Sequence, residues 1–381
     1  MRFSDIAAGL PDVLAAAFGS GSDIVIDREP PTDTSDQPWL AVKYGPSGDD
    51  DVHGVTGFQI HSGDRVLDLI VKVNPVHGIG ETLIPWIVQH HDVALPQPYP
   101  LFHSTAEVVA TGTREANLYE LSRDLPELEA VLPVFYGVIA VHGERAIVVA
   151  DEGHVRGLDA GGTDIHWSGE DIDTALRGIG AVHAASTSAV GDVAWLPRRP
   201  TADSMSADSA LWRALLADAA DRFPDIVTDA VQRNRETLIE TLPTWHAAKD
   251  VLPTVLAHND FNPRNVGFRA DGRLLVLDWE LARKDSPTRD VAELLTFTLD
   301  PNADEATVRH HAREHRHAMA AHGIPIAEDA HLASLAADLN AEAIDRVGMQ
   351  LLLAAAFDLP YVPAINATVD HLNHVTASWL S

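Results

Sequence analysis

The hydrophobic pattern of the sequence changes near residue 150, and this change constrains the fold more than any other feature. Short apolar runs with strand-like spacing, separated by turns rich in Gly, Pro, Ser and Asp, occupy much of residues 24–73 and 134–150. Beyond this point most apolar residues recur at helical spacing, interrupted by one β-rich segment at 255–281. The pattern predicts an α+β protein with a β-rich part at 1–150, begun by a helix, and a helical part at 151–381.

Composition excludes several classes of protein. The chain has no cysteine, so it forms no disulfide framework and carries no thiolate nucleophile or Cys-based metal site. Its 27 basic and 56 acidic residues give a formal net charge of −29, which repels nucleic acid and anionic membranes. No apolar run reaches the roughly 18 residues that a membrane span requires. We therefore expect a cytoplasmic protein without nucleic-acid or membrane partners, and its oligomeric state stays open.

The spacing of an acid, an amide and a second acid in the β-rich segment indicates a metal-dependent site. Asp260 precedes Asn265 on a loop, and Asp278 follows at the far end of a predicted hairpin. The hairpin folds Asp278 back beside Asn265, where both offer the hard oxygen ligands that Mg²⁺ prefers. Asp260 then lies close enough to accept a proton from a hydroxyl nucleophile. The alternative is an ordinary acidic turn next to a chance hydrophobic hairpin.

The motif His258-x-Asp260-x-x-x-x-Asn265, followed by a strand that ends at Asp278, resembles the catalytic and metal loops of aminoglycoside phosphotransferases, choline kinases and their relatives. These are small-molecule kinases on a protein-kinase-like scaffold. The resemblance implies a bilobal fold: an antiparallel β-sheet N-terminal lobe with one main helix, and a mostly helical C-terminal lobe that carries the catalytic and metal loops. It also implies that Asp260 is the catalytic base, that Asn265 and Asp278 bind Mg²⁺, and that His258 braces the loop.

Such a kinase needs a lysine on a strand to bind the nucleotide phosphates, and a helix glutamate to hold that lysine. Lys72 lies in the apolar run Leu69–Val73 and is one of four lysines in the chain. Glu115 stands in a stretch similar to the family's Arg-Glu-x-x-x-Tyr helix, so we choose it as the partner, with Glu81 as the alternative. The long interval between Lys72 and Glu115 implies an insertion at about residues 76–110.

Two further segments are candidates for nucleotide binding. The first is a turn between predicted strands, whose small residues suit a close approach to phosphates. These residues are Gly45, Ser47 and Gly48. Three aspartates follow at 49–51 and would repel a nucleotide unless they face solvent, so a solvated hairpin tip is the alternative. The second is the hinge expected after the strand that ends at Ala150, where family members hold the adenine on backbone groups; its candidates are Ala150 and Glu152.

Other residues near the motif receive supporting roles from the same resemblance. Asp290 matches the acid that begins the helix after the metal loop, and we expect it to cap that helix or brace the loop. Glu280 belongs to an Asp-Trp-Glu triplet similar to the Asp-Phe-Glu of choline kinases. It is a candidate contact to the substrate or to a second metal, with a local salt bridge as the alternative. His183 is expected to be a packed structural histidine.

Four histidines at 310, 311, 315 and 317 suggest a helical metal site. The glutamate that follows the first histidine of a zinc-protease helix is missing, because Ala312 stands there. Charged residues surround the cluster, so a solvated helix face is the better interpretation.

These observations predict an O-phosphotransferase that moves the γ-phosphoryl group of ATP, with GTP as an open alternative, to a hydroxyl of a small molecule with the help of Mg²⁺. Amino sugars, aminoglycosides, sugars and amino alcohols all stay open as acceptors. Candidate acceptor contacts are Asp159, Asp173, Glu342, Asp345 and Tyr361. The alternatives are a nucleotide-binding pseudokinase that serves as a scaffold, and a metal-dependent hydrolase that would not need Lys72.

Overall fold

The structure is a computed structural model that describes residues 1–19, 24–28, 52, 54–74, 85–89, 111–159, 166–357 and 359–380. The three candidate phosphate contacts, Gly45, Ser47 and Gly48, lie outside the described residues. Glu81 and most of the expected insertion also lie outside them. Predictions about these positions therefore stay predictions.

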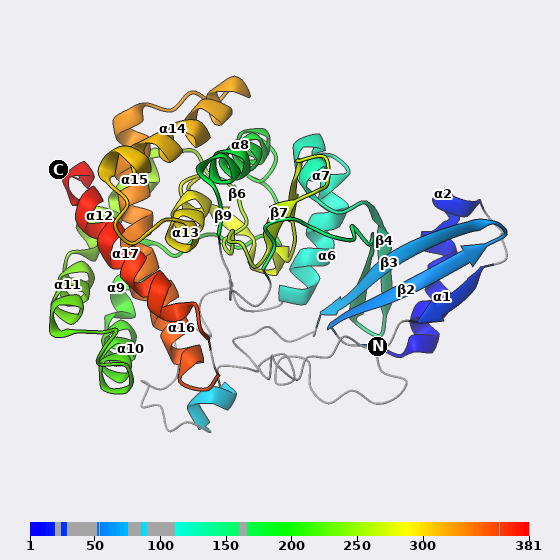
Figure 1. The fold of residues 1–381 in the computed structure, drawn as a ribbon, viewed down its shortest axis with the longest axis horizontal. Coiled ribbons are helices and arrows are strands. Elements are labelled where there is room, and N and C mark those ends of the chain that lie inside the picture. Colours follow the sequence, from blue (N-terminus) through cyan, green and yellow to red (C-terminus); the bar gives the residue numbers. More distant parts are fainter. Residues whose placement is uncertain are drawn as a thin grey trace.

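One end of the molecule is an antiparallel sheet of five strands in the order β1-β2-β3-β5-β4 (Figure 1). Its strands are β1 (Val25–Arg28), β2 (Gly54–Ser62), β3 (Arg65–Asn74), β4 (Phe135–Val141) and β5 (Glu144–Ala150). Leu69, Val71 and Val73 of the central β3 are buried on one face of the sheet. Because side chains alternate along a strand, Lys72 projects from the opposite face.

Helices cover both faces of this sheet. The N-terminal residues form α1 (Phe3–Val13) and α2 (Ala15–Phe18), which confirms the N-terminal helix. Ile6 and Leu10 of α1 share a core cluster with Leu69, so α1 covers the face away from Lys72. On the other face, α6 (Thr111–Ser122) contacts β3, β4 and β5. The sheet thus presents Lys72 to α6, and α6 lies between the sheet and the helical end of the molecule (Figure 1).

The other end is mostly helical, as the apolar spacing predicts, and the α+β class is confirmed. Its helices are α7 (Pro126–Val131), α8 (Gly169–Ser186), α9 (Ala202–Ala207), α10 (Ser209–Arg222), α11 (Asp229–Glu240), α12 (Leu242–His246), α13 (Arg289–Thr298), α14 (Glu305–Ala321), α15 (Glu328–Ala341), α16 (Val347–Ala354) and α17 (Val362–Thr376). Side-chain caps from Ser168, Thr228 and Asp304 begin α8, α11 and α14. Among the described residues, no helix is both long enough and apolar enough to span a membrane.

One part of the expected insertion is described, residues 85–89, and it is helical. The ring of Trp86 stacks on Phe357, just beyond α16, with ring centroids 5.8 Å apart. Ile87 is buried in the same core cluster as Trp212 and Trp245 (short cyan helix near α16 in Figure 1). This segment therefore packs on the helical end.

The predicted β-rich segment is present between α6 and α13 (Figure 1), and its short strands are buried, whereas the tip of its hairpin is exposed. β7 (Val266–Phe268) pairs with β8 (Leu274–Val276) as an antiparallel hairpin. β6 (Val255–Ala257) pairs with β9 (Arg283–Asp285) and brackets it. Because every residue of these short strands is buried, the continuous apolar runs of the sequence fit them better than helices.

Replacing Gly267 in β7 with alanine is expected to destabilise this hairpin. The added Cβ would lie 2.6 Å from Val155 Cγ1 and 3.0 Å from the carbonyl oxygen of Arg156. That carbonyl is fixed because it accepts a 2.8 Å hydrogen bond from the backbone N–H of Phe268. Such overpacking costs about 1–3 kcal/mol of unfolding free energy, measurable as a lower urea midpoint. Gly191→Ala, where a Cβ meets nothing within 4 Å, is the control; equal midpoints for the two variants would contradict the prediction.

The prediction that the histidine cluster lies on a solvated helix face is wrong for two of its four residues. His311 and His315 are buried, because α14 packs against α8 and α15 and the i, i+4 pair lies on the packed face. His310 is partly exposed, and His317 is exposed as expected. His183, on α8, is fully buried and meets the prediction of a packed histidine.

Candidate active site

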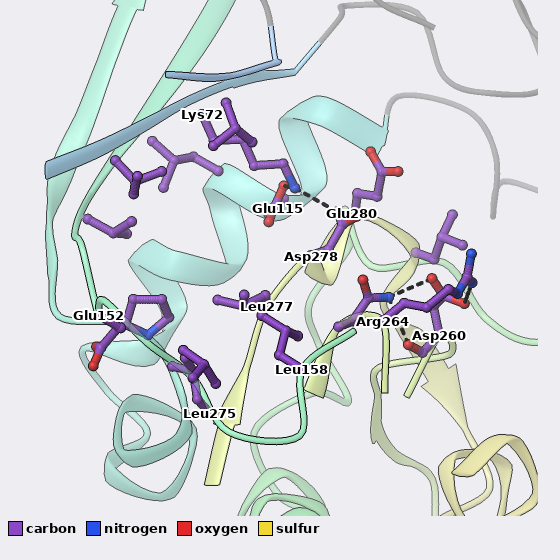
Figure 2. A pocket seen from close by; sticks show the side chains of 18 of the residues that line it. Lys72, Glu115, Glu152, Leu158, Asp260, Arg264, Leu275, Leu277, Asp278 and Glu280 are labelled. Carbon is purple, nitrogen blue, oxygen red and sulfur yellow. Dashed lines mark hydrogen bonds and ion pairs between the residues drawn. The ribbon is translucent and has the colours of Figure 1, made fainter. Parts of the chain in front are cut away.

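A cavity of about 490 Å³ lies between the sheet and the β7–β8 hairpin (Figure 2), and residues of α16 also line it. The residues that line it come from segments far apart in the sequence. They include Lys72, Glu115, Ala150, Glu152, Asp260, Asn265, Asp278 and Glu280, all predicted as site residues, and Tyr361 from the acceptor guesses. His258 and Asp290, predicted to support the site, are not in the lining, and both lie directly behind it.

Lys72 connects the sheet to the hairpin through two ion pairs. Its Nζ lies 2.7 Å from Glu115 Oε2 on α6 and 2.6 Å from Asp278 Oδ1 after β8 (Figure 2). Glu115 is buried and also accepts a hydrogen bond from the side chain of Asn74. The structure therefore places the chosen glutamate beside the lysine, and it brings Asp278 within reach of the same ammonium group.

The loop before β7 orients Asp260. Asn265 Nδ2 donates to Asp260 Oδ2 at 2.7 Å and to the Asp260 carbonyl at 3.0 Å. His258 Nδ1 accepts a hydrogen bond from the backbone N–H of Asp260, so Nε2 carries the proton and donates to the carbonyl of Leu277 at 2.8 Å. His258 thereby links the loop of Asp260 to the residue before Asp278.

Asp278 sits at the end of the hairpin in a left-handed backbone conformation, with φ 58° and ψ 58°. Non-glycine residues seldom adopt this conformation, and they cluster at functional sites where the surrounding structure holds them. Here the Leu277 N–H donates to the Asn265 carbonyl at 2.8 Å, and Trp279 packs fully buried against His258. These contacts hold Asn265 and Asp278 at the same end of the hairpin.

Behind the loop, Asp290 is a fully buried acceptor at the start of α13. Its carboxylate accepts from the backbone N–H groups of His258 (2.7 Å) and Asn259 (2.8 Å), and from His183 Nε2 (3.0 Å). From His183 a hydrogen-bonded chain continues through His315 to His331, each step 3.0 Å long. Asp290 therefore braces the loop from behind.

The groups around the carboxylates of Asp260 and Asp290 favour the ionised form of each. Burial acts to raise the pKa of Asp260, but the nearby guanidinium groups of Arg264 and Arg346 outweigh it and hold the pKa below its usual value. Burial likewise opposes ionisation of Asp290, yet the hydrogen bond from His183 helps to keep its pKa low. Asp260 is therefore an unprotonated acceptor at neutral pH.

The expected hinge follows β5 and forms one wall of the cavity. The Ala150 N–H donates to the carbonyl of Val134 at 2.9 Å, which fixes the end of the strand. The carboxylate of Glu152 is ion-paired with Arg269 at 3.0 Å, so its side chain is already engaged within the protein. Any contact from this segment to a nucleotide is then expected to come from backbone groups.

The oxygen donors at the hairpin end fit a small divalent cation. Asn265 uses its amide nitrogen on Asp260, which leaves its carbonyl oxygen as the ligand atom on the other side. Asp278 supplies a carboxylate, and both are the hard oxygen ligands that Mg²⁺ prefers. Glu280 follows two residues later, lines the cavity and is buried.

The sequence analysis missed several residues at the site. Arg264 and Arg346 approach Asp260 Oδ1 at 3.3 and 3.8 Å, and Asn262 Nδ2 donates to the same oxygen at 3.0 Å. Arg264 and Asn262 stand inside the motif and could have been considered there. No local signal marks Arg346, which belongs to a helical segment far along the chain.

Most of the guessed acceptor contacts lie elsewhere. Glu342 is buried and ion-paired with Arg289, and Asp173 contacts His310 and His311 on α14. Among the guesses, Tyr361 alone belongs to the lining of the cavity within the described part of the chain.

A sheet lysine paired with a helix carboxylate, opposite a hairpin that carries an aspartate, an asparagine and a second aspartate, defines a kinase-like site on a bilobal protein-kinase-like fold. Residues 156–322, which include the motif, match the phosphotransferase enzyme family. The family resemblance inferred from the motif is confirmed for this segment, and with it the class of small-molecule kinase.

Several solved structures are similar to this one. Choline kinase LicA from Streptococcus pneumoniae has 12% identity and a TM-score of 0.47, covering 98% of this chain and 99% of that chain. An aminoglycoside phosphotransferase from Alicyclobacillus acidocaldarius has 13% identity and a TM-score of 0.48, with coverages of 93% and 96%. Macrolide 2'-phosphotransferase MphH from Brachybacterium faecium has 16% identity and a TM-score of 0.45, with coverages of 94% and 98%. No curated protein sequence matches significantly.

Proposed function

We propose that this chain transfers the γ-phosphoryl group of ATP to a hydroxyl group of a small molecule. The observation that carries the proposal is the pairing of Lys72 with both Glu115 and Asp278 across one cavity that also contains Asp260. This combination fits phosphoryl transfer, because it places a cation for the phosphates, oxygen ligands and a proton acceptor around one space. A metal-dependent hydrolase would not need the lysine. A pseudokinase would not need the lysine, the proton acceptor and the metal ligands together.

Each residue then has a distinct task. Lys72, oriented by Glu115, contacts the α- and β-phosphates. Asn265 and Asp278 hold Mg²⁺, which when bound neutralises the charge on the phosphate oxygens. Asp260 orients the acceptor hydroxyl and takes its proton as the oxygen bonds to the γ-phosphorus and the bond to the β-phosphate oxygen breaks. Most of the acceleration comes from positioning and electrostatics.

The remaining assignments complete the proposal. The hinge after β5 holds the adenine on backbone groups near Ala150 and Glu152, and Glu280 contacts the acceptor or a second metal. GTP could replace ATP without changing any of these roles. The division into a nucleotide-binding part at 1–150 and a catalytic part at 151–381 falls at the end of β5, and we assign the protein to the cytoplasm.

The test is transfer of labelled phosphate from γ-labelled ATP with Mg²⁺ in single-turnover reactions. The acceptor panel contains kanamycin, choline, glucosamine, glucose and hydroxylated organic acids, and products are identified by mass spectrometry. Mg·ATP analogue binding is measured separately by calorimetry. Failure to bind the nucleotide, together with no phosphorylated product, would refute the proposal.

Replacing Lys72 with alanine is expected to lower transfer by about 10²- to 10³-fold, the typical loss of one well-placed electrostatic group. The loss arises because Glu115 and Asp278 then face the anionic nucleotide without their shared cation. Single-turnover rates measure the effect. Arg65→Ala, which removes an exposed cation from the same strand, is the matched control and should leave the rate nearly unchanged. Equal rates for wild type and Lys72→Ala would favour a hydrolase instead.

A further inference from the structure

The cavity continues beyond Asp260 into a region whose chemistry differs from its nucleotide end. This acceptor end is lined by the cations Arg264 and Arg346, by Gln350, and by a wall of apolar and aromatic side chains. The wall consists of Met349, Leu353, Phe357, Leu359 and Tyr361. Its composition bears directly on which acceptors the site can hold.

Arg264 is held so that its guanidinium faces the acceptor end beside Asp260 (Figure 2). Nε donates to Asn262 at 3.2 Å, NH1 donates to the Tyr361 hydroxyl at 3.1 Å, and the guanidinium stacks 5.0 Å over the Tyr361 ring. Its contact to Asp260 Oδ1, 3.3 Å, is longer than the 2.7–2.9 Å of a strong charge-assisted hydrogen bond. A fixed planar guanidinium is well suited to recognise an oxyanion.

Arg346 reaches the same place from an irregular turn of helix. Residues Glu342–Arg346 form a π-helical turn between α15 and α16, and such turns occur frequently at functional sites. Arg346 lies 3.8 Å from Asp260 Oδ1 and 3.5 Å from Glu293 Oε2. The widened turn thus brings a second guanidinium to the oxygen that Arg264 contacts.

Most of the acidic residues near these two cations are already paired with basic groups of the protein. Glu293 is fully buried, is paired with Arg289 at 2.6 Å and with Arg346 at 3.5 Å, and does not line the cavity. Asp278 is paired with Lys72 at 2.6 Å, and Glu280 follows it two residues later (Figure 2). Among the described residues that line the cavity, Asp260 is the carboxylate that contacts these two cations, and the proposed reaction reserves it for the hydroxyl. A cationic acceptor would meet two guanidinium groups there, which is unfavourable in a largely apolar cavity.

Gln350 adds an independent sign of a ligand. It lies one turn after Arg346, its side chain is 6% exposed, and it lines the cavity. Its Oε1 atom is buried and receives no hydrogen bond from the described residues. A buried acceptor without a donor is costly unless a ligand supplies one.

We propose that the acceptor is a hydroxylated organic oxyanion with an apolar flank. Its oxyanion lies between Arg264 and Arg346, its reacting hydroxyl faces Asp260, and a second hydroxyl or N–H group donates to Gln350. The apolar wall packs against the rest of the molecule. This inference rests on the proposed function and narrows its acceptor to a class opposite in charge to aminoglycosides and choline. Carboxylates and phosphate monoesters share the required chemistry.

A matched series of four probes tests it. In each probe one carbon carries a hydrogen, a phenyl group and a hydroxymethyl group, and only its fourth substituent differs. The probes are 3-hydroxy-2-phenylpropanoate, its carboxamide, the corresponding aminomethyl compound, and the monophosphate of 2-phenylpropane-1,3-diol. Calorimetry measures their binding to the complex of the protein with Mg²⁺ and a non-hydrolysable ATP analogue. At least one oxyanion should bind about tenfold or more tightly than the carboxamide, and the amine should bind most weakly. The better of the two oxyanions tells a carboxylate site from a phosphate site.

Arg264→Gln should reduce the preference for the oxyanion over the carboxamide to about twofold or less. The informative quantity is the ratio of the affinities for the oxyanion and the carboxamide. If the substitution acted only through Asp260 or the nucleotide, both affinities would change by the same factor and their ratio would stay the same. Arg273→Gln, on the exposed tip of the same hairpin, should keep the wild-type ratio. If Arg264→Gln does not fold, Arg346→Gln provides the same comparison.

Three results would overturn the inference: tightest binding of the amine, no binding of either oxyanion at about 10 mM, or an unchanged ratio in the arginine variant. These results can be told apart from failure of the proposed function. If the proposed function fails, the ATP analogue does not bind to the wild-type protein. If only the acceptor inference fails, the ATP analogue binds and the preference among the acceptors differs from the expected one.

Discussion

Replacing Asp260 with asparagine is expected to lower phosphoryl transfer by about 10²- to 10⁴-fold, the usual contribution of a positioned general base. The change removes the proton acceptor but preserves the size of the side chain. An amide oxygen can still accept the hydrogen bond that Asn265 Nδ2 now donates to Asp260. The fold and the Lys72 end of the cavity should therefore persist, and affinity for Mg·nucleotide should stay within a few-fold of wild type.

Single-turnover rates and calorimetry on the same preparations separate the two effects. Asp271→Asn is the matched control, since Asp271 is an exposed carboxylate at the tip of the same hairpin and is paired with the nearby Arg273. It should leave both quantities unchanged. Near-normal transfer by Asp260→Asn would show that another group accepts the proton and would remove the basis for the assigned mechanism.

The hairpin and its three polar residues could be predicted because their signals are local. Short apolar runs fix β7 and β8, and a turn at Asp271-Gly272 joins them, so the spacing of Asn265 and Asp278 dictates their proximity. Lys72 could be predicted for a similar reason, because alternation along β3 separates it from its buried neighbours. In each case neighbouring residues of one element carry the information.

The acceptor end could not be predicted because it is assembled from distant segments. Arg346 reaches Asp260 through a π-helical turn, and spacing arguments assume a regular helix with 3.6 residues per turn. His311 and His315 were misjudged because charged neighbours in sequence suggested a solvated helix. The burial of one helix face depends on α8 and α15, which pack against α14 from elsewhere in the chain. Tertiary packing, rather than local pattern, decided both outcomes.

Replacing Asp290 with asparagine is expected to cost about 3 kcal/mol or more of unfolding free energy, because it disrupts a fully buried charge-assisted network. The carboxylate accepts three hydrogen bonds, from two backbone N–H groups and His183. Asparagine has one oxygen and an NH₂ group, so at least one buried donor must face another donor. His315 and His331 continue the chain as neutral rings, since burial lowers the pKa of both, that of His331 to about 3, and neither can compensate by charging.

The pH dependence of the unfolding midpoint shows whether the loss of stability in Asp290→Asn comes from the missing carboxylate charge. Asp290 has a lowered pKa in the folded protein, so its stabilising effect is fully present above the ordinary aspartate pKa of about 3.9 and is lost as pH falls through the folded value. The difference in unfolding midpoint between wild type and Asp290→Asn should therefore be constant from pH 8 to 5 and shrink only below about pH 4. Asp300→Asn, at an exposed turn, should not alter the midpoint. A difference that already shrinks between pH 7 and 6 would assign the effect to histidine protonation instead, and an unchanged midpoint would show that the loop holds His258 and Asp260 in place without Asp290.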